Sequence, residues 1–195
     1  MLVWLDDLRL NAELTGPTDA PPVVLIQGLG LDLSLWDAVL SRLRTRILRL
    51  DLRGQGASDT PPAPYAMGAL IRDVERLVDH FALKDAVVLG AGEGGLIAQG
   101  LAVKRLDLVR AMVLTGSATR FGNPDLWASR IARHRATGLD VAAECAAFLG
   151  PRWAGSPATP ALQALLDRAR PDGWQGFAAA IATTDFYQTT ATLTL

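Results

Sequence analysis

The chain is poor in the two residue types that build most disulfides and transition-metal sites. Its 195 residues include one cysteine, Cys145, and two histidines, His80 and His134. A single cysteine excludes a disulfide within the chain and a cysteine-based metal cluster. Two isolated histidines give no reason to expect a multi-histidine metal site. We therefore expect no metal and no other cofactor.

Excess charge of one sign and long hydrophobic runs are also absent. Twenty acidic residues oppose 19 basic ones, and the net charge of −1 lacks the basic excess of nucleic-acid binders. No apolar run approaches the roughly 18–20 residues that cross a bilayer. Asp6-Asp7 lies where an export signal would carry basic residues. We expect a cytoplasmic protein that binds neither nucleic acid nor membranes.

Half of the residues are hydrophobic, which is enough for one sizeable core. Continuous apolar runs predict strands that are buried on both faces, and apolar residues at helical spacing predict helices between them. The expected strands are 2–5 and 8–14, forming a hairpin, then 23–26, 47–50, 86–89 and 111–114; the expected helices are 35–43, with Ser34 as N-cap, 67–81 and 96–104. This alternation predicts an α/β fold with a mostly parallel sheet and right-handed crossovers.

The alternation stops after Thr115. Residues 124–182 contain helical stretches rich in Ala and Leu, which are typical of a helical cap or insertion. The tail, 189–195, alternates Thr, Ala and Leu and predicts the approach to another strand. We expect a core over residues 1–119, a cap over 120–186, and the start of a return to the core over 187–195.

The most informative segment is the glycine turn between a predicted strand and a predicted helix. Gly90, Gly92 and Gly95 match the G-x-G-x-x-G pattern of dinucleotide-binding units. That alternative needs an acidic residue about 20 positions later, at the end of the next strand, but residues 114–117 read Leu-Thr-Gly-Ser. The other possibility is a nucleophile elbow, G-x-S-x-G, which fits these surroundings better.

Several segments around the turn share one further pattern. Residues 29–37 follow the first core strand, 51–58 are similar to D-x-R-G-H-G-x-S, and 94–100 follow the elbow. The others are Asn123-Pro124 with Trp127, Arg152-Trp153 and 184–186. In this order and spacing the chain resembles the α/β-hydrolase superfamily, and more narrowly the 3-oxoadipate enol-lactonases of aromatic catabolism. The resemblance implies an α/β-hydrolase fold with a helical cap, truncated before its last strands.

The resemblance also implies a mechanism of ester or lactone hydrolysis. In the family an elbow serine attacks the carbonyl, a later histidine takes its proton, an aspartate orients the histidine, and two N–H groups hold the oxyanion. Gly92 occupies the nucleophile position, and Leu29 and Glu93 occupy the positions that supply the N–H groups. Glycine cannot form an acyl-enzyme, and no histidine follows His134. We expect serine, aspartate and histidine all to be missing, and this chain to be inactive.

Four residues remain as candidates for the pocket. Gln27 lies where the superfamily often has histidine before glycine, and Trp127 and Trp153 could line a ligand cavity or simply pack in the core. The Glu93 carboxylate could act as a base in a dry pocket, or it could turn outward and favour the helix N-terminus.

Four functions stay open at this point. The chain could be a pseudoenzyme that holds a small organic acid or lactone, one half of a complemented hydrolase, an enzyme that uses Glu93, or a dinucleotide-binding module. In the fold that it resembles, the strand 111–114 is interior, but here it would be an edge without charge, proline or obvious bulge. We therefore expect a homo-oligomer or a complementing chain at this strand.

Overall fold

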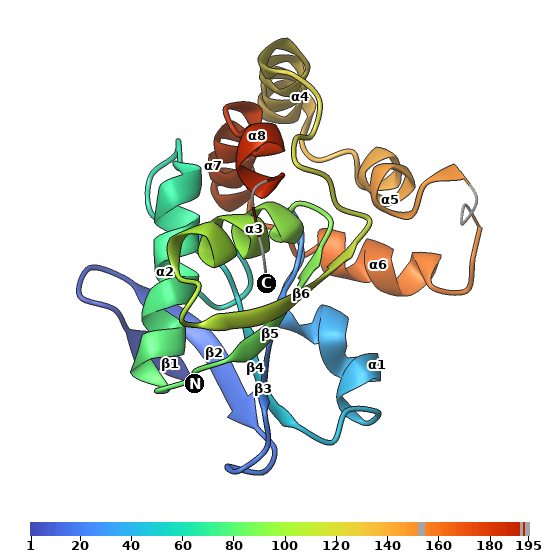
Figure 1. Cartoon of the computed structure of the whole chain (residues 1–195). Coiled ribbons are helices and arrows are strands. Elements are labelled where there is room, and N and C mark those ends of the chain that lie inside the picture. The colour runs from blue at the N-terminus through green and yellow to red at the C-terminus, as the bar shows by residue number, and fades with distance from the viewer. Residues whose placement is uncertain (152–154, 192, 194–195) are drawn as a thin grey trace.

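A six-stranded sheet forms the centre of the computed structural model, which describes residues 1–151, 155–191 and 193 (Figure 1). Strands β4, β3, β5 and β6 run parallel, whereas β1 and β2 join one side as antiparallel strands. The prediction of a mostly parallel sheet is confirmed. In spatial order the strands are β1 (Leu2–Trp4), β2 (Arg9–Thr15), β4 (Arg46–Leu50), β3 (Pro22–Ile26), β5 (Ala86–Ala91) and β6 (Val109–Thr115).

The central strand β3 shows why its apolar run is continuous. Val24 and Ile26 belong to the large core cluster that includes side chains of α2 (Met67–His80) and α3 (Gly94–Lys104). Leu25 points to the opposite face, where it joins a second cluster with Trp36 and Ile47. The short helices η1 (Leu33–Trp36) and α1 (Asp37–Leu40) cover that second face (Figure 1). Since both faces are covered, successive residues are all buried.

The helical segment after β3 begins differently from the sequence-based expectation. Asp32, not Ser34, is the N-cap, and its carboxylate accepts a hydrogen bond from the Ser34 backbone N–H at 3.0 Å. The prediction of Ser34 as the cap was therefore wrong by two residues. Both residue types favour this position, and the extended backbone of Asp32 decides between them.

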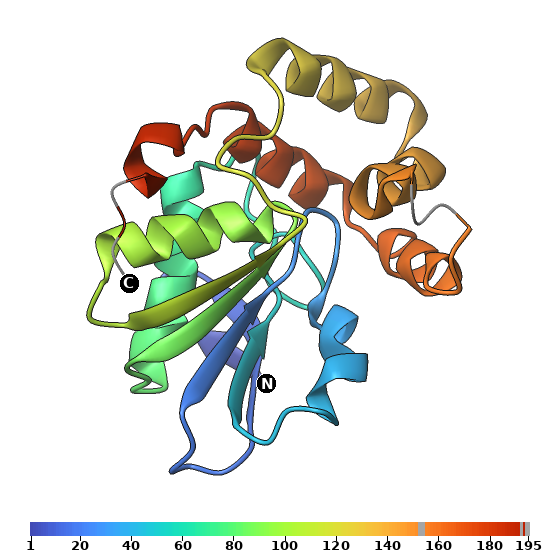
Figure 2. The ribbon, with the colours of Figure 1, turned by 45° about the vertical axis from the view of Figure 1, so that its right-hand side comes forward.

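A layer of helices lies beyond the carboxyl ends of the parallel strands (Figure 2). It consists of α4 (Pro124–Thr137), α5 (Val141–Leu149), α6 (Thr159–Leu166) and α7 (Pro171–Ala182). Helix α4 packs against α7, and α5 packs against α6. The layer is tied to the sheet by α7, because Trp174, Phe177 and Ile181 belong to the large core cluster.

The described part of the tail is helical where a strand was expected. Helix α8 spans Tyr187–Thr190, so the expectation of an extended segment is wrong for residues 189 and 190. The Thr190 hydroxyl donates a hydrogen bond to Gln99 of α3 at 2.8 Å, which fixes this turn against the core. Residues 192, 194 and 195 of the predicted segment lie outside the described residues.

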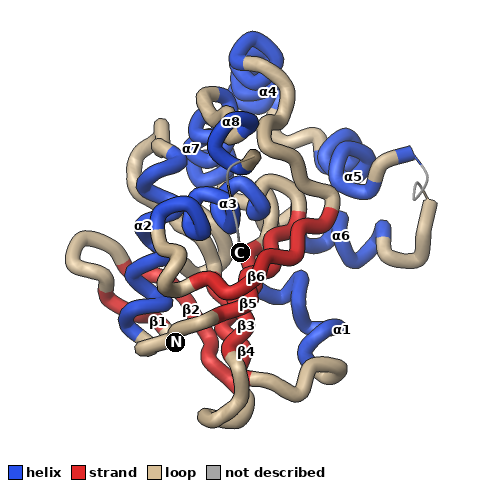
Figure 3. Tube along the Cα trace, in the orientation of Figure 1, coloured by secondary structure: helices blue, strands red, loops and turns tan. Residues whose placement is uncertain are grey.

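Strand β6 lies at the edge of the sheet (Figure 3). Within the described ranges it pairs with β5 alone, and the side chains of Val113 and Leu114 are 48% and 41% exposed. The register shifts between the pairs Ala86–Val109 and Val87–Ala111. This irregularity leaves Arg110 as an extra residue just before the predicted segment 111–114, in which the register with β5 is regular.

Candidate functional site

The tight turn after β5 has the geometry of an elbow. Gly92 has φ = +56°, in the left-handed region that glycine enters without a Cβ penalty. Its N–H donates to the Thr115 carbonyl of β6 at 2.9 Å, and its own carbonyl accepts from Gly95 N–H at 3.1 Å. The turn is thereby held between the end of β6 and the start of α3.

Gly94 lets α3 begin close to the end of β3. A Cβ atom at this position would lie 2.5 Å from the backbone oxygens of Ile26 and Gln27. Any larger residue would push the helix away from the strand, because two backbone atoms cannot turn aside as a side chain can. Glycine therefore sets the distance between the elbow and the loop after β3, which carries Leu29.

A cavity of about 250 Å³ opens above Gly92. Gly92 and Glu93 form part of its lining, together with side chains from η1, from the segment after β6 and from α5: Trp36, Phe121, Ala147 and Phe148. A Cβ atom on Gly92 would lie 3.2 Å from the ring of Phe148. The space is mainly apolar, as is typical of small-molecule sites, and Glu93 brings a carboxyl group to it.

The Glu93 side chain turns towards the loop after β3 and not outward. Its Oε2 atom accepts a hydrogen bond from the Leu29 N–H at 3.2 Å. Burial raises the pKa of the Glu93 carboxyl, while hydrogen bonds from the N–H groups of Glu93 and Leu29 and the charge of Arg130 oppose that rise. A carboxyl group in such surroundings can donate or accept a proton closer to neutral pH than an ordinary glutamate.

The loop that carries Leu29 is fixed by two buried glutamines. The Gln27 amide donates to the Leu50 carbonyl at 2.8 Å and to the Gln55 side chain at 3.3 Å. In turn, Gln55 donates to the Gly28 carbonyl at 3.0 Å. Gln27 does not line the cavity above Gly92. Its contacts make it a positioning residue for the Leu29 loop, not a ligand contact.

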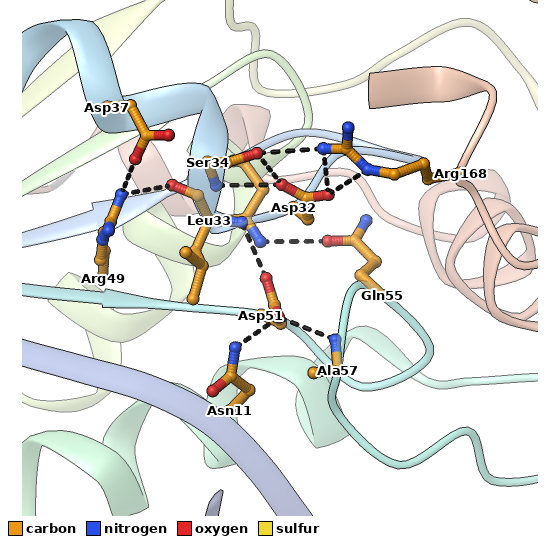
Figure 4. Close-up of polar contacts among 11 residues, drawn as sticks. Asn11, Asp32, Leu33, Ser34, Asp37, Arg49, Asp51, Gln55, Ala57 and Arg168 are labelled. Carbon is orange, nitrogen blue, oxygen red and sulfur yellow. Dashed lines mark hydrogen bonds and ion pairs between the residues drawn. The ribbon is translucent and has the colours of Figure 1, made fainter. Parts of the chain in front are cut away.

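Asp51 holds three segments together beneath this loop (Figure 4). Its carboxylate accepts hydrogen bonds from the backbone N–H of Leu33 at 2.7 Å, that of Ala57 at 2.9 Å and the Asn11 amide at 2.8 Å. Asp51 follows β4 directly, and its side chain is buried. The family-like segment 51–58 thus has a clear structural role.

Neither histidine of the chain lines the cavity. His134 on α4 stacks on Trp174 with ring centroids 4.6 Å apart, and its Nδ1 lies 3.1 Å from the Gln175 amide. Burial lowers the pKa of His134. His80 ends α2, with its ring edge-on to Phe81. The structure therefore places no imidazole beside Gly92.

The remaining candidates are placed as follows. Trp127 is buried, and its indole N–H donates to the Phe121 carbonyl. It lies beneath Arg130, whose guanidinium stands 4.2 Å from its ring centroid, and it does not line the cavity. Trp153 lies outside the described residues. Cys145 is buried in a small apolar cluster, where desolvation raises its pKa, as expected of an inert core thiol.

Aromatic residues were the part of the site that sequence reasoning missed. Phe121 and Phe148 face Gly92 from segments that follow it by 29 and 56 positions in the chain. Trp36 both packs in a core cluster and lines the cavity. No motif signals such residues, because only the path of the later helices brings them over the elbow.

Two kinds of feature are absent from the described residues. In that part of the chain there is no group of three or more His, Cys, Asp or Glu side chains arranged to bind a metal ion. It also contains no helix with the length and apolar character needed to cross a bilayer.

The chain has clear relatives among known proteins. The sequence pattern of the alpha/beta hydrolase fold matches residues 21–191. A 3-oxoadipate enol-lactonase from Acinetobacter baylyi is 32% identical over 149 residues, which are 75% of this chain and 55% of that protein. A second enol-lactonase from the same organism is 28% identical over 74% of this chain and 53% of its own length. The chain thus spans about half the length of these curated relatives.

Solved structures agree with this relationship. A hydrolase from Pseudomonas aeruginosa superposes with a TM-score of 0.85 at 31% identity, over 95% of this chain and 73% of the other. The enol-lactonase from Burkholderia xenovorans gives a TM-score of 0.83 at 28% identity, over 95% and 74% of the two chains. Sequence pattern, relatives and fold lead to the same conclusion: this chain belongs to the alpha/beta hydrolase fold family.

Proposed function

We propose that this chain is an enol-lactonase-like member of the family that binds a small lactone or ester above Gly92 without hydrolysing it. One observation carries the proposal: the cavity is present, but the elbow residue at its base has no side chain. The ligand class is taken from the relatives, two of which are named 3-oxoadipate enol-lactonases.

The chemistry of the site supports binding over acyl transfer. A nucleophile needs a hydroxyl or thiol with a base in hydrogen-bond reach, and Gly92 offers neither. The two histidines of the chain lie in other parts of the fold. Glu93 is the remaining group in the cavity that could act as a base, and it is hydrogen-bonded to Leu29.

The first test measures binding and turnover of the same class of molecule. Ligand-observed NMR with phthalide, a small aromatic lactone, should show saturable binding. Ala147→Phe fills the cavity from α5 and should weaken that binding about tenfold or more. Ala146→Phe is the matched control, because Ala146 is an exposed neighbour on the same helix that does not line the cavity.

Turnover should be at background level in the same samples. Loss of a serine or histidine from a working triad costs roughly 10⁶-fold in rate. Wild type and Gly92→Ser should therefore both leave an enol-lactone and a nitrophenyl ester uncleaved. Saturable hydrolysis by the wild type that Glu93→Gln abolishes would contradict the proposal and establish a Glu93-dependent enzyme.

We also propose that the chain pairs with a second copy of itself through the edge of β6. The exposed Val113 and Leu114 flank unpaired backbone groups, and such an edge is a template for another strand. In an antiparallel pair centred between Met112 and Val113, Arg110 would face Thr115 of the partner subunit. Like charges would thus not oppose each other across the two-fold axis.

Light scattering across a dilution series tests this association. The wild type should be dimeric at high concentration and dissociate on dilution, whereas Val113→Lys should remain monomeric, since a charge blocks edge pairing. Val103→Lys is the control, because Val103 is 40% exposed and lies on helix α3, not on the pairing strand. A wild type that stays monomeric at every concentration, or equal behaviour of the two lysine variants, would refute pairing through β6.

A further inference from the structure

The carboxyl group of Glu93 is held at a fixed place on the cavity wall. Its Oε2 atom accepts from the Leu29 N–H at 3.2 Å. A Cβ atom built on Gly28 would lie only 2.8 Å from the same oxygen, so the carboxyl group rests directly against the loop after β3. The backbone N–H of Glu93 also favours the ionised form of this carboxyl group, because it lowers the pKa.

These two N–H groups are the ones that the fold would offer to an anion. The N–H of Glu93 lies at the start of the 11-residue helix α3, where the helix dipole favours negative charge. The N–H of Leu29 reaches the same point from the neighbouring loop. In this chain the anion is internal: the Glu93 side chain occupies the place that a ligand's carboxylate or oxyanion would need.

The positive charge of Arg130, next to Glu93, does not make this place attractive to an anion. Arg130 lines a small space next to Glu93, together with Glu144. Its guanidinium is already bound by both Glu144 carboxylate oxygens, at 2.6 and 2.7 Å. Glu144 thus occupies this guanidinium, and an incoming carboxylate would find no unpaired positive partner among these three side chains.

We propose that Glu93 is a specificity-determining residue that makes the cavity favour uncharged and cationic ligands over carboxylates. A donor on the ligand would bind the Glu93 carboxyl oxygens. A cationic group would gain further from the faces of Trp36, Phe121 and Phe148, which line the same space. This selection deepens the proposed binding function and depends on it.

Three probes of similar size and different charge test the selection. Benzamide is neutral, benzylamine is cationic and benzoate is anionic at pH 8, and titration calorimetry or ligand-observed NMR gives each affinity. In the wild type, benzylamine and benzamide should bind and benzoate should be weakest. Glu93→Gln should weaken benzylamine about tenfold and leave benzamide within about threefold, because a charge-assisted hydrogen bond becomes a neutral one.

Benzoate, the anion that the cavity should exclude, gives the clearest difference between the wild type and a variant. Glu93→Ala frees both N–H groups, and benzoate should gain about tenfold or more in affinity. Glu13→Gln, on β2 beside Arg49, changes the net charge by the same amount as Glu93→Gln but is distant from the cavity, and it should leave the order of the three probes unchanged. The amide proton of Leu29 should also move upfield in Glu93→Ala, since it loses its acceptor.

The outcomes separate this inference from the proposed function. If benzamide binds but benzoate and benzylamine respond to Glu93→Ala and Glu93→Gln as they do to Glu13→Gln, the cavity binds ligands and Glu93 does not select them. If none of the probes and no lactone binds to any variant, the proposed function fails and the inference fails with it. An unmoved Leu29 amide would refute the contact itself.

Discussion

An Asp51→Ala variant is expected to unfold about 3–5 kcal/mol more easily than the wild type. The substitution leaves the backbone N–H of Leu33 without its acceptor in a buried place, and it also removes the acceptor of the half-buried Ala57 N–H and Asn11 amide. Each buried polar group that loses its partner costs about 1–3 kcal/mol, and more where the partner is charged. Urea denaturation followed by circular dichroism measures the difference.

The matched control for Asp51 lies close by in the same network (Figure 4). Asp37 forms an exposed ion pair with Arg49, which keeps Glu13 as a second partner. Exposed ion pairs contribute about 0–1 kcal/mol, so Asp37→Ala should change the free energy of unfolding by less than about 1 kcal/mol. Equal losses in the two variants would show that Asp51 is not the anchor that its three contacts indicate.

Gly94→Ala is expected to have a comparable effect through packing. Its added methyl group would meet the carbonyl oxygens of Ile26 and Gln27 at 2.5 Å, inside any normal contact distance. Overpacking usually costs about 1–3 kcal/mol, and here the obstacle is backbone on a central strand, so we expect about 3 kcal/mol or more. Thermal and urea unfolding of the purified variant measure the loss.

Gly68→Ala is the control for Gly94→Ala. It also adds a methyl group to a helical glycine, but here the change should stabilise the protein. Gly68 lies in the exposed face of α2, and a Cβ there would find nothing within 4 Å. Replacing a helical glycine in open space stabilises by up to about 1 kcal/mol, because alanine loses less backbone entropy. If Gly94→Ala were as harmless as Gly68→Ala, the close approach of α3 to β3 would be wrong.

The sheet could be predicted from sequence because its signals are local. Val23–Ile26 is apolar at every position, and that pattern follows directly from burial on both faces. The cap of the first helical turn could not be fixed in the same way. Asp32 and Ser34 are both favoured N-cap residues, and the choice depends on the backbone angles of a loop that is itself held by Asp51.

The candidate site likewise has features that local sequence predicts and one that it does not. The position of Gly92 in a tight turn follows from its glycine-rich surroundings, and so does the place of Leu29 after the first core strand. The direction of the Glu93 side chain does not, because an acid at a helix start commonly faces solvent. Its inward orientation depends on a contact with Leu29, 64 residues away in the chain. Local sequence patterns do not predict a contact over such a separation.

The way α7 is built into the fold has a consequence for protein engineering. Its Gly176 carbonyl accepts a hydrogen bond from Tyr65 at 3.1 Å, and Arg170 just before it donates to the Ser58 carbonyl at 2.8 Å. Trp174 is buried in the main core. A chimera that exchanges the whole helical layer for another sequence would remove part of the hydrophobic core with it. Grafts that aim to change ligand preference should therefore end before residue 170 and leave α7 in place.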